Sequence, residues 1–291
     1  MNAQSRLKLL PIVLLTVMEV VGATAISRLA SANTPPPPAS PNIQPTVVDA
    51  TAQKSVPELI KLLNHPVFMV QQDAARTLGK IGKAAIPSLI PLLQAPDQVV
   101  RAYAALALGS MGESAESAIP SLVPLLKDSD EDVKAYASRA LGKIGKAAIP
   151  SLIPLLKDSG NMAQWYAAPA FGAMDESAKS AAIPSLIPLL KDSDWGTRSV
   201  AADALGWMGE SAKSTIHSLI PLLKDSDWRV RSAAADALGR MGKSAKSAIP
   251  SLIPLLKDSD ERVRASAANA LLVIDQPREH RDFRTLSEYF Q

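Results

Sequence analysis

The sequence predicts an all-α fold, a right-handed α-solenoid of about seven helical hairpins, and three observations lead to it. The phrase Ala-Ile-Pro-Ser-Leu-Ile-Pro-Leu-Leu-Lys-Asp-Ser, or a close variant, recurs along most of the chain. Its copies begin 30 to 34 residues apart, a period typical of stacked repeats. Of the 291 residues, 47% are hydrophobic but only 4% aromatic, which suits an Ala/Leu interior of short helices. A repeat this small depends on its neighbours to bury its apolar face.

Each copy of the phrase begins a repeat, and the repeats are numbered 1 to 7 by their first residues: Val56, Ile86, Ile119, Ile149, Ile183, Ile216 and Ile249. A proline follows this residue in every repeat except repeat 6, and the start of a helix tolerates its missing N–H. A second proline comes four residues later, as at Pro91, and it would disrupt a long helix. The phrase therefore predicts a short first helix.

A second, amphipathic helix is predicted in each repeat, and repeat 6 is representative. Asp225–Asp227 forms the turn, with Asp227 as the N-cap. Gly239 and Gly242 are predicted to mark the end of the helix. The residues expected to face the core recur at helical spacing: Val230, Ala234, Ala237, Leu238 and Met241.

The pattern Leu-Ile-Pro-Leu-Leu-Lys-Asp…Val-Arg…Ala-Ala…Ala-Leu-Gly, from Leu219 to Gly239, resembles a HEAT repeat. It is also similar to the short form found in bacterial, especially cyanobacterial, proteins of the bilin-lyase HEAT-like class. The resemblance covers about residues 56–275, and it predicts fold better than function because one repeat fold hosts many binding roles. It also implies a structural ladder between neighbouring repeats, made by acidic and basic residues six apart: Asp128/Lys134, Asp192/Arg198, Asp225/Arg231 and Asp258/Arg264.

The variable face of the second helix is the candidate binding groove, because this helix usually lines the concave side of HEAT arrays. In repeat 6 this face comprises Arg229, Ser232, Ala233, Asp236 and Arg240. Tyrosines occupy the same position of this face in repeats 2, 3 and 4, and Tyr and Trp are favoured at interface hot spots. The predicted partner-binding residues are Tyr103, Tyr136, Tyr166, Trp165, Trp207, Phe68, Arg76, Lys80, Arg139 and Lys143.

One alternative stays open for the tyrosines. They could instead pack along adjacent helices and face inward. Trp195 and Trp228 occupy another position, directly after the turn, where a local packing role is expected. Asp203 and Asp236 replace the groove arginines in repeats 5 and 6, so the groove is expected to be basic and aromatic at one end and more acidic at the other.

Repeat 4 departs most from the pattern. Pro169 lies in the middle of its second helix, where proline costs roughly 3 kcal/mol and removes a hydrogen bond to the Trp165 carbonyl. A kink there is expected, either as a functional hinge or as the mark of a decayed repeat. Its other substitutions are Gly160 at the N-cap, Ala163 for the core Val, Gln164 for the Arg and Phe171 for the core Leu.

Residues 1–32 resemble an export signal. Arg6 and Lys8 precede the apolar stretch Leu9–Val21, interrupted by Glu19, and Ala30–Ala32 resembles a cleavage site. Export to the periplasm, the thylakoid lumen or the extracellular space is therefore expected. The alternative is an uncleaved membrane anchor formed by residues 9–26, since 18 residues are near the minimum for crossing a bilayer.

The segments flanking the repeats have separate predicted roles. Residues 33–54 are rich in proline and predict an extended spacer, and residues 276–291 predict a cap on the last repeat. Cleavage after residue 32 would leave 28 basic and 27 acidic residues. So balanced a chain lacks the positive charge of a nucleic-acid binder, and a membrane partner is expected only if the signal is uncleaved.

Catalysis is not expected. The chain has no Cys, and its three histidines, His65, His217 and His280, are scattered, so no metal site is predicted. HEAT-like deoxyhypusine hydroxylases bind iron through His-Glu pairs, and here Glu279-His280 is reversed and single. The predicted function is a non-catalytic scaffold that binds a protein or peptide and needs no cofactor. The alternatives are a bilin (phycobilin) lyase-like or pigment-binding protein and a purely structural spacer.

Overall fold

The computed structural model describes residues 54–158 and 162–275. These residues form two units, an N-terminal unit up to Thr215 and a C-terminal unit from Ile216. The regular structure of both is entirely helical, as predicted. The predicted signal or anchor, the cap and all of the spacer except Lys54 lie outside the described residues. Within the described ranges, no helix combines the length and the apolar character needed to cross a membrane.

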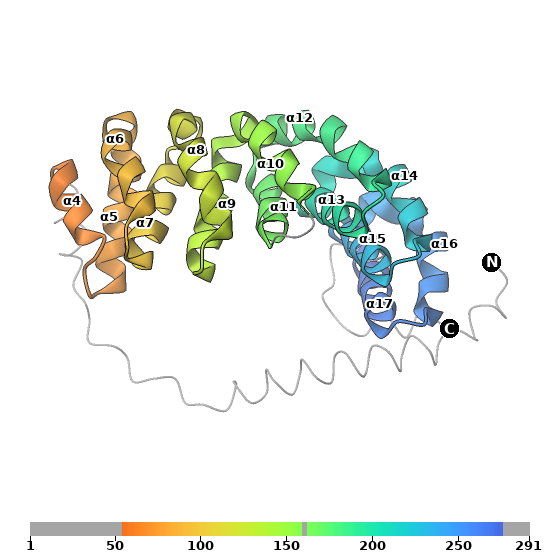
Figure 1. Cartoon of the computed structure of the whole chain (residues 1–291). Helices are drawn as coiled ribbons and strands as arrows, with labels where there is room; N and C mark the ends of the chain where they lie inside the picture. Colours follow the sequence, from red (N-terminus) through yellow and green to blue (C-terminus); the bar gives the residue numbers. More distant parts are fainter. Residues whose placement is uncertain (1–53, 159–161, 276–291) are drawn as a thin grey trace, which may run out of the picture. The chain divides into compact units, whose positions relative to one another are not determined.

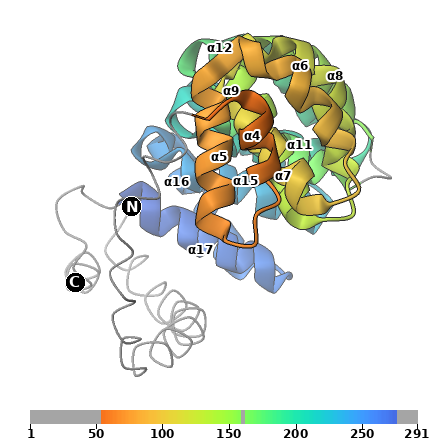
Figure 2. The same ribbon diagram turned by 90° about the vertical axis from the view of Figure 1, so that its left-hand side faces the viewer.

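Five helical hairpins make up the N-terminal unit (Figure 1). Their second helices are α5 (Phe68–Ile81), α7 (Gln98–Ser110), α9 (Glu131–Ile144), α11 (Ala163–Ala173) and α13 (Trp195–Met208). Each of these packs against the next along the chain. The first helices are α4 (Val56–Leu62), α6 (Ile86–Leu89), α8 (Ile119–Leu122), α10 (Ile149–Leu156) and α12 (Glu176–Leu186). Viewed from the α4 end, α6 and α8 lie on one side of the unit and α5 and α7 on the other (Figure 2).

Two further hairpins make up the C-terminal unit. They pair α14 (Ile216–Leu219) with α15 (Trp228–Arg240), and α16 (Ile249–Leu252) with α17 (Glu261–Asp275). The two second helices, α15 and α17, pack against each other. The predicted core residues of repeat 6 are confirmed: Val230, Ala234, Ala237, Leu238 and Met241 are at most 2% exposed.

The first helix is short in most repeats, as the prolines predict. The second proline lies where the helix tightens from α to 3₁₀ geometry, as in α6 followed by η2 (Ile90–Gln94). The same change follows α8, α12, α14 and α16, in η4 (Val123–Lys127), η6 (Ile187–Lys191), η8 (Ile220–Lys224) and η10 (Ile253–Lys257). Repeat 4 differs, because α10 remains α-helical through Pro154. The missing proline N–H therefore favours the tighter turn without enforcing it.

The links between hairpins are themselves helical, which the sequence did not predict. They form the 3₁₀ segments η1 (Gly82–Ala85), η3 (Gly112–Ala118), η5 (Gly145–Ala148), η7 (Gly209–Thr215) and η9 (Gly242–Ala248). After repeat 4 there is no such segment; instead Asp175 caps α12 by accepting a hydrogen bond from the Ala178 N–H. The short links of the 30-residue repeats are thus the same structure with fewer residues.

Both ends of the second helix follow from single residues. The predicted N-cap is confirmed, since Oδ1 of Asp227 accepts a hydrogen bond of 2.8 Å from the Arg229 N–H. Gly242 follows the end of α15 with φ of +57°, a conformation that favours glycine.

The prediction for Gly239 was wrong, because this residue lies inside α15. A Cβ there would stand 3.0 Å from the Ala270 Cα, so the glycine allows α15 and α17 to approach closely. Gly109 plays the same part between α7 and α9, where a Cβ would be 2.8 Å from the Ala140 Cα.

The predicted ladder is present and joins neighbouring repeats. Arg101 Nε and Nη2 each donate to the carboxylate of Asp128 in the next repeat at 2.8 Å, and Arg231 and Asp258 make the same pair at 2.8 and 2.7 Å. The six-residue spacing has a separate role: Arg231 Nη1 donates to the Asp225 carbonyl at 2.9 Å. Arg101 and Arg231 thus each fix their own turn and bind the next repeat.

Repeat 3 is an exception to the ladder. Lys134 was expected to take part in the ladder to a neighbouring repeat, but its Nζ binds Glu131 Oε1 of its own helix at 2.7 Å. A lysine lacks the planar fork with which arginine reaches both the turn carbonyls and a carboxylate.

Repeat 4 keeps its second helix despite its proline. Helix α11 runs from Ala163 to Ala173 with Pro169 inside it, so the proline does not divide the helix. Phe171 is fully buried in place of the usual leucine, as predicted. Gln164 is 3% exposed, and its Oε1 has no hydrogen-bond partner among the described residues. The predicted N-cap position, Gly160, lies outside the described residues.

Candidate partner-binding surface

The candidate site consists of exposed side chains on the second helices of the N-terminal unit, called here the second-helix surface. Phe68, Trp165 and Trp207 are 58%, 40% and 47% exposed. The predicted basic residues Arg76, Lys80, Arg139 and Lys143 are also exposed. Tyr136 and Tyr166 are half-buried. Most predicted site residues are therefore accessible to a partner.

Tyr103 differs from the predicted groove position, because it is only 4% exposed. Its ring centroid lies 6.3 Å from that of Phe68 and 6.2 Å from that of Tyr136. Burial raises the pKa of its hydroxyl, with smaller effects from Tyr136 and Asp132. Adjacent second helices pack side by side, so this position falls at the seam between them. The alternative of inward packing is correct for Tyr103.

The same seam explains a second correction. Ala233 was predicted to lie on the groove face of repeat 6, but it is 6% exposed. It occupies on α15 the position that Tyr103 occupies on α7, two residues after the ladder arginine. A face opposite the core is thus only partly open when the neighbouring helix covers one of its edges.

Tyr166 forms a separate cluster with two charged residues of α9. Its hydroxyl donates a hydrogen bond to the Glu131 carboxylate, and Lys134 Nζ lies 4.7 Å from the centre of its ring. Lys134 is 5% exposed. The predicted tyrosine row therefore divides into a stacked part, Phe68–Tyr103–Tyr136, and a charged cluster at Tyr166.

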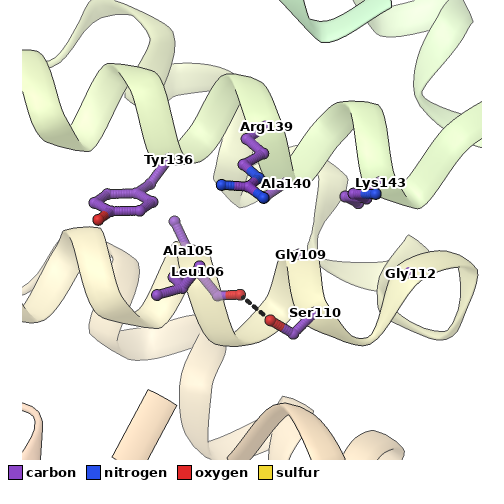
Figure 3. Close-up of a pocket in the computed structure, with 9 residues that line it drawn as sticks. All are labelled: Ala105, Leu106, Gly109, Ser110, Gly112, Tyr136, Arg139, Ala140 and Lys143. Atoms are coloured by element: carbon purple, nitrogen blue, oxygen red, sulfur yellow. Dashed lines mark hydrogen bonds between the residues drawn. The ribbon is translucent and has the colours of Figure 1, made fainter. Parts of the chain in front are cut away.

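A pocket of about 360 Å³ opens between α7 and α9. Figure 3 shows Tyr136, Arg139 and Lys143 on α9 facing Ala105, Leu106 and Ser110 on α7. The remaining lining residues are Gly109, Gly112 and Ala140, and Ser110 Oγ donates to the Leu106 carbonyl at 2.9 Å. None of these lining residues is acidic. The pocket therefore combines small residues, one aromatic ring and two cations.

The sequence contains a signal for this pocket that the search for groove aromatics does not use. The position nine residues after the ladder residue is Lys80, Ser110, Lys143, Ala173 and Trp207 in repeats 1 to 5. Ser110 and Ala173 are the two short side chains among these five. Between α7 and α9 the short Ser110 leaves space beside the following helix, and that space is the pocket.

Asp236 occupies in repeat 6 the position that Arg139 occupies in repeat 3, but it is less exposed than Arg139. Asp236 is half-buried on α15. Burial raises the pKa of its carboxyl, opposed by a hydrogen bond from Ser266 and by the charge of Arg240. Packing of α15 against α17 therefore holds this carboxyl partly away from water.

The two turn tryptophans differ from each other. Trp228 lies beneath Arg262 of the next repeat, with Cζ 4.5 Å from the ring centre, so it helps to join α15 and α17. Trp195 is 36% exposed.

The two histidines that the structure describes, His65 and His217, share no site. His65 Nδ1 accepts a hydrogen bond of 3.1 Å from the Val67 N–H, His217 is exposed on α14, and His280 lies outside the described residues. Among the residues that the structure describes, no three His, Cys, Asp or Glu side chains group so as to hold a metal ion.

Several proteins of known structure are similar to this chain. An engineered protein of known structure is 26% identical, with 76% of this chain and 96% of that chain covered and a TM-score of 0.33. The Escherichia coli protein YibA is 20% identical, with 82% and 99% covered and a TM-score of 0.40. A designed armadillo repeat protein in complex with the peptide (KR)4 is 21% identical, with 76% and 100% covered and a TM-score of 0.33.

No curated protein sequence matches the chain. A family model described as HEAT repeats matches residues 48–109, 86–168, 149–217, 183–272 and 216–288. These overlapping matches span almost all of the chain outside its N-terminal segment. The chain therefore belongs to the HEAT-repeat family.

Proposed function

We propose that this protein is a non-catalytic scaffold that captures a protein or peptide segment on the second-helix surface of its N-terminal unit. The observation that carries this proposal is the exposure of three large aromatic side chains on second helices of the unit, Phe68 on α5, Trp165 on α11 and Trp207 on α13. Exposed aromatic residues on a rigid frame supply much of the binding energy at protein interfaces. A repeat array offers such residues on an extended surface.

The same surface combines apolar and charged contacts. Exposed basic residues lie on the same helices as the aromatic residues. Helix α5 carries Arg76 and Lys80 as well as Phe68, and α9 carries Arg139 and Lys143 as well as Tyr136. Aromatic and arginine side chains are the types enriched at interface centres. The surface thus has the composition of an interface, whereas the buried Tyr103 serves to hold α5, α7 and α9 together.

The test compares binding by two variants of the full chain. In F68A/W165A/W207A the exposed aromatic rings are lost, whereas V273A removes a side chain of α17 that is 52% exposed and outside the surface. We expect the triple variant to lose partner capture and V273A to retain it, with equal helical content by circular dichroism. Crosslinking with mass spectrometry in the native compartment then locates the partner. Crosslinks confined to Lys191 of η6 and Lys224 of η8, rather than Lys80 and Lys143 of the second helices, would contradict the proposal.

Export remains part of the proposal. Residues 1–32 have the charge and hydropathy pattern of a signal, so we propose that the scaffold works in the periplasm, the thylakoid lumen or the extracellular space. Mass spectrometry of the mature N-terminus checks this. An intact N-terminus in the membrane fraction would support the anchor at residues 9–26 instead.

Pigment binding is the second candidate. The α7/α9 pocket of about 360 Å³ is within the range of small-molecule sites, and Tyr136 offers it a flat ring. A bilin bound there would change its absorbance spectrum on mixing with the protein. An unchanged spectrum at saturating protein removes this candidate and leaves the scaffold proposal intact.

A further inference from the structure

We infer that the α7/α9 pocket binds the carboxylate of a Glu or Asp side chain carried by an extended peptide partner. The inference rests on the proposed function, because it names the chemistry of a partner on the second-helix surface. It depends on three features of the pocket: its charge, its shape and the charges beside it.

The charge of the pocket is positive and uncompensated. Arg139 and Lys143 are both exposed, and among the described residues neither has a carboxylate within ion-pair distance. They are four residues apart on α9, a spacing at which like charges destabilise a helix by a few tenths of a kcal/mol. The helix dipole stabilises a cation in the last turn. The dipole therefore accounts for Lys143, which lies in the last turn of α9, but it does not account for Arg139, which precedes that turn.

The shape of the pocket suits one side chain reaching in from outside. Gly109 brings α7 and α9 together, since a Cβ there would stand 2.8 Å from the Ala140 Cα. Ser110 leaves open the space that lysine occupies at the equivalent positions of α5 and α9. Arg139 and Lys143 border this space while Leu106 and Tyr136 supply apolar contact. A Glu side chain has matching parts, a short apolar stem and a charged end.

The charges beside the pocket favour a peptide over a nucleic acid. Glu131 and Asp132 are exposed at the N-terminal end of α9, and Glu131 is engaged by Lys134 and Tyr166. A phosphate backbone presents charge at every nucleotide, so it would meet these carboxylates near the pocket. A peptide can place one acidic residue at Arg139 and Lys143 and neutral residues elsewhere.

The expected preference is for carboxylate over amide. Hydrogen bonds to ionised groups are roughly twice as strong as those between neutral groups, and arginine can bind both oxygens of a carboxylate. Changing the anchoring Glu of a bound peptide to Gln should therefore weaken binding by about tenfold. Higher salt should weaken the Glu peptide more than the Gln peptide, because screening acts on the charged pair.

The experiment selects peptides from a randomised library of C-terminally amidated hexapeptides against the full chain. Selected peptides should share one position restricted to Glu or Asp. Their affinities are measured by fluorescence anisotropy for the wild-type protein, for R139Q/K143Q and for the matched control K83Q/K157Q, which removes two exposed cations outside the pocket. We expect about a tenfold loss for R139Q/K143Q and no change for the control.

A double-mutant cycle completes the test. If the peptide carboxylate contacts Arg139 and Lys143, the Glu-to-Gln peptide and R139Q/K143Q should each weaken binding, and their combination should lose little more than either alone. Selected peptides without an acidic position, or additive losses, overturn the inference while the scaffold proposal stands. Recovery of no peptide contradicts the proposed function and the inference with it. An oligonucleotide that binds more tightly than the selected peptides, through the same two residues, also overturns it.

Discussion

Two junctions in the N-terminal unit solve the same packing problem differently. Between repeats 2 and 3, Arg101 binds Asp128 through two hydrogen bonds of 2.8 Å, with both side chains largely buried. Between repeats 3 and 4, Lys134 turns to Glu131 on its own helix, and Lys127 reaches Asp158 at a more exposed position. The ladder therefore stabilises the array without being required at every junction.

The second junction also carries polar groups that the first does not. Ser138 Oγ and Gln164 Oε1 are buried without hydrogen-bond partners among the described residues. At the position of Ser138, α7 has Ala105, which has no polar side-chain atom. Polar groups left unsatisfied inside a protein reduce its stability. We therefore expect the junction between repeats 3 and 4 to be less stable than the junction between repeats 2 and 3.

The largest expected effect comes from breaking the intact junction. R101A would leave the Asp128 carboxylate buried without its partner, at a cost of about 3–5 kcal/mol in the free energy of unfolding. Urea denaturation measures it. R76A is the matched control, because Arg76 is exposed and lies 3.9 Å from Asp73, so its loss should cost less than about 1 kcal/mol. Equal losses in the two variants would contradict the structural role of the ladder.

The next effect comes from repairing repeat 4. P169A restores a backbone donor for the Trp165 carbonyl inside α11, and should raise stability by up to about 3 kcal/mol. The melting temperature and partner affinity are measured together. Raised stability with unchanged affinity identifies repeat 4 as a decayed repeat, whereas raised stability with reduced affinity supports a hinge.

A smaller gain should follow from replacing the buried amide of repeat 4. Q164L removes the unsatisfied Oε1 and keeps an apolar side chain of similar size, so we expect about 1–2 kcal/mol of stabilisation. Gln98 is exposed at the start of α7, and Q98L should change stability by less than about 0.5 kcal/mol. A destabilised Q164L would show that the amide makes a stabilising contact.

The smallest effect separates two carboxylates of the C-terminal unit by pH. A hydrogen bond from Arg231 lowers the pKa of Asp258 from its ordinary value. The contribution of Asp258 to stability is present above the unfolded pKa and is lost as pH falls through the folded pKa. Burial raises the pKa of Asp236 from its ordinary value, so the ionisation of Asp236 destabilises the fold at neutral pH and this penalty disappears in acid.

Variants at these two positions should therefore respond to pH with opposite signs. D258N should be less stable than the wild-type protein at pH 7 and approach it in acid. D236N should be more stable at pH 7, and its advantage should shrink toward pH 3. Thermal melts across this range measure both, and parallel curves for the two variants would refute the assignment.

The hairpins, caps and core could be predicted because each depends on residues close in sequence. Asp227 caps the helix that it precedes, and the buried stripe of α15 follows from helical spacing alone. Tyr103 and Gly239 could not be placed in this way. Their environments depend on how closely the neighbouring second helix approaches, and a single repeat contains no measure of that distance.

The site shows the same limit. The exposed Phe68, Trp165 and Trp207 were predicted as site residues from the second-helix face. The pocket was not, because it arises between Ser110 on one helix and Arg139 on the next. Its signal was the absence of a long side chain, which is visible only when positions are compared between repeats.

The way in which Arg101 joins Asp128 also bears on how such a chain can change in length. The arginine belongs to one repeat and its carboxylate partner to the next, and Arg231 and Asp258 are divided between two repeats in the same way. A copied or deleted repeat therefore brings or leaves complementary ends. Recombination between near-identical repeats can lengthen or shorten the array in whole steps, and the junction around Lys134 is where such an exchange would find mismatched halves.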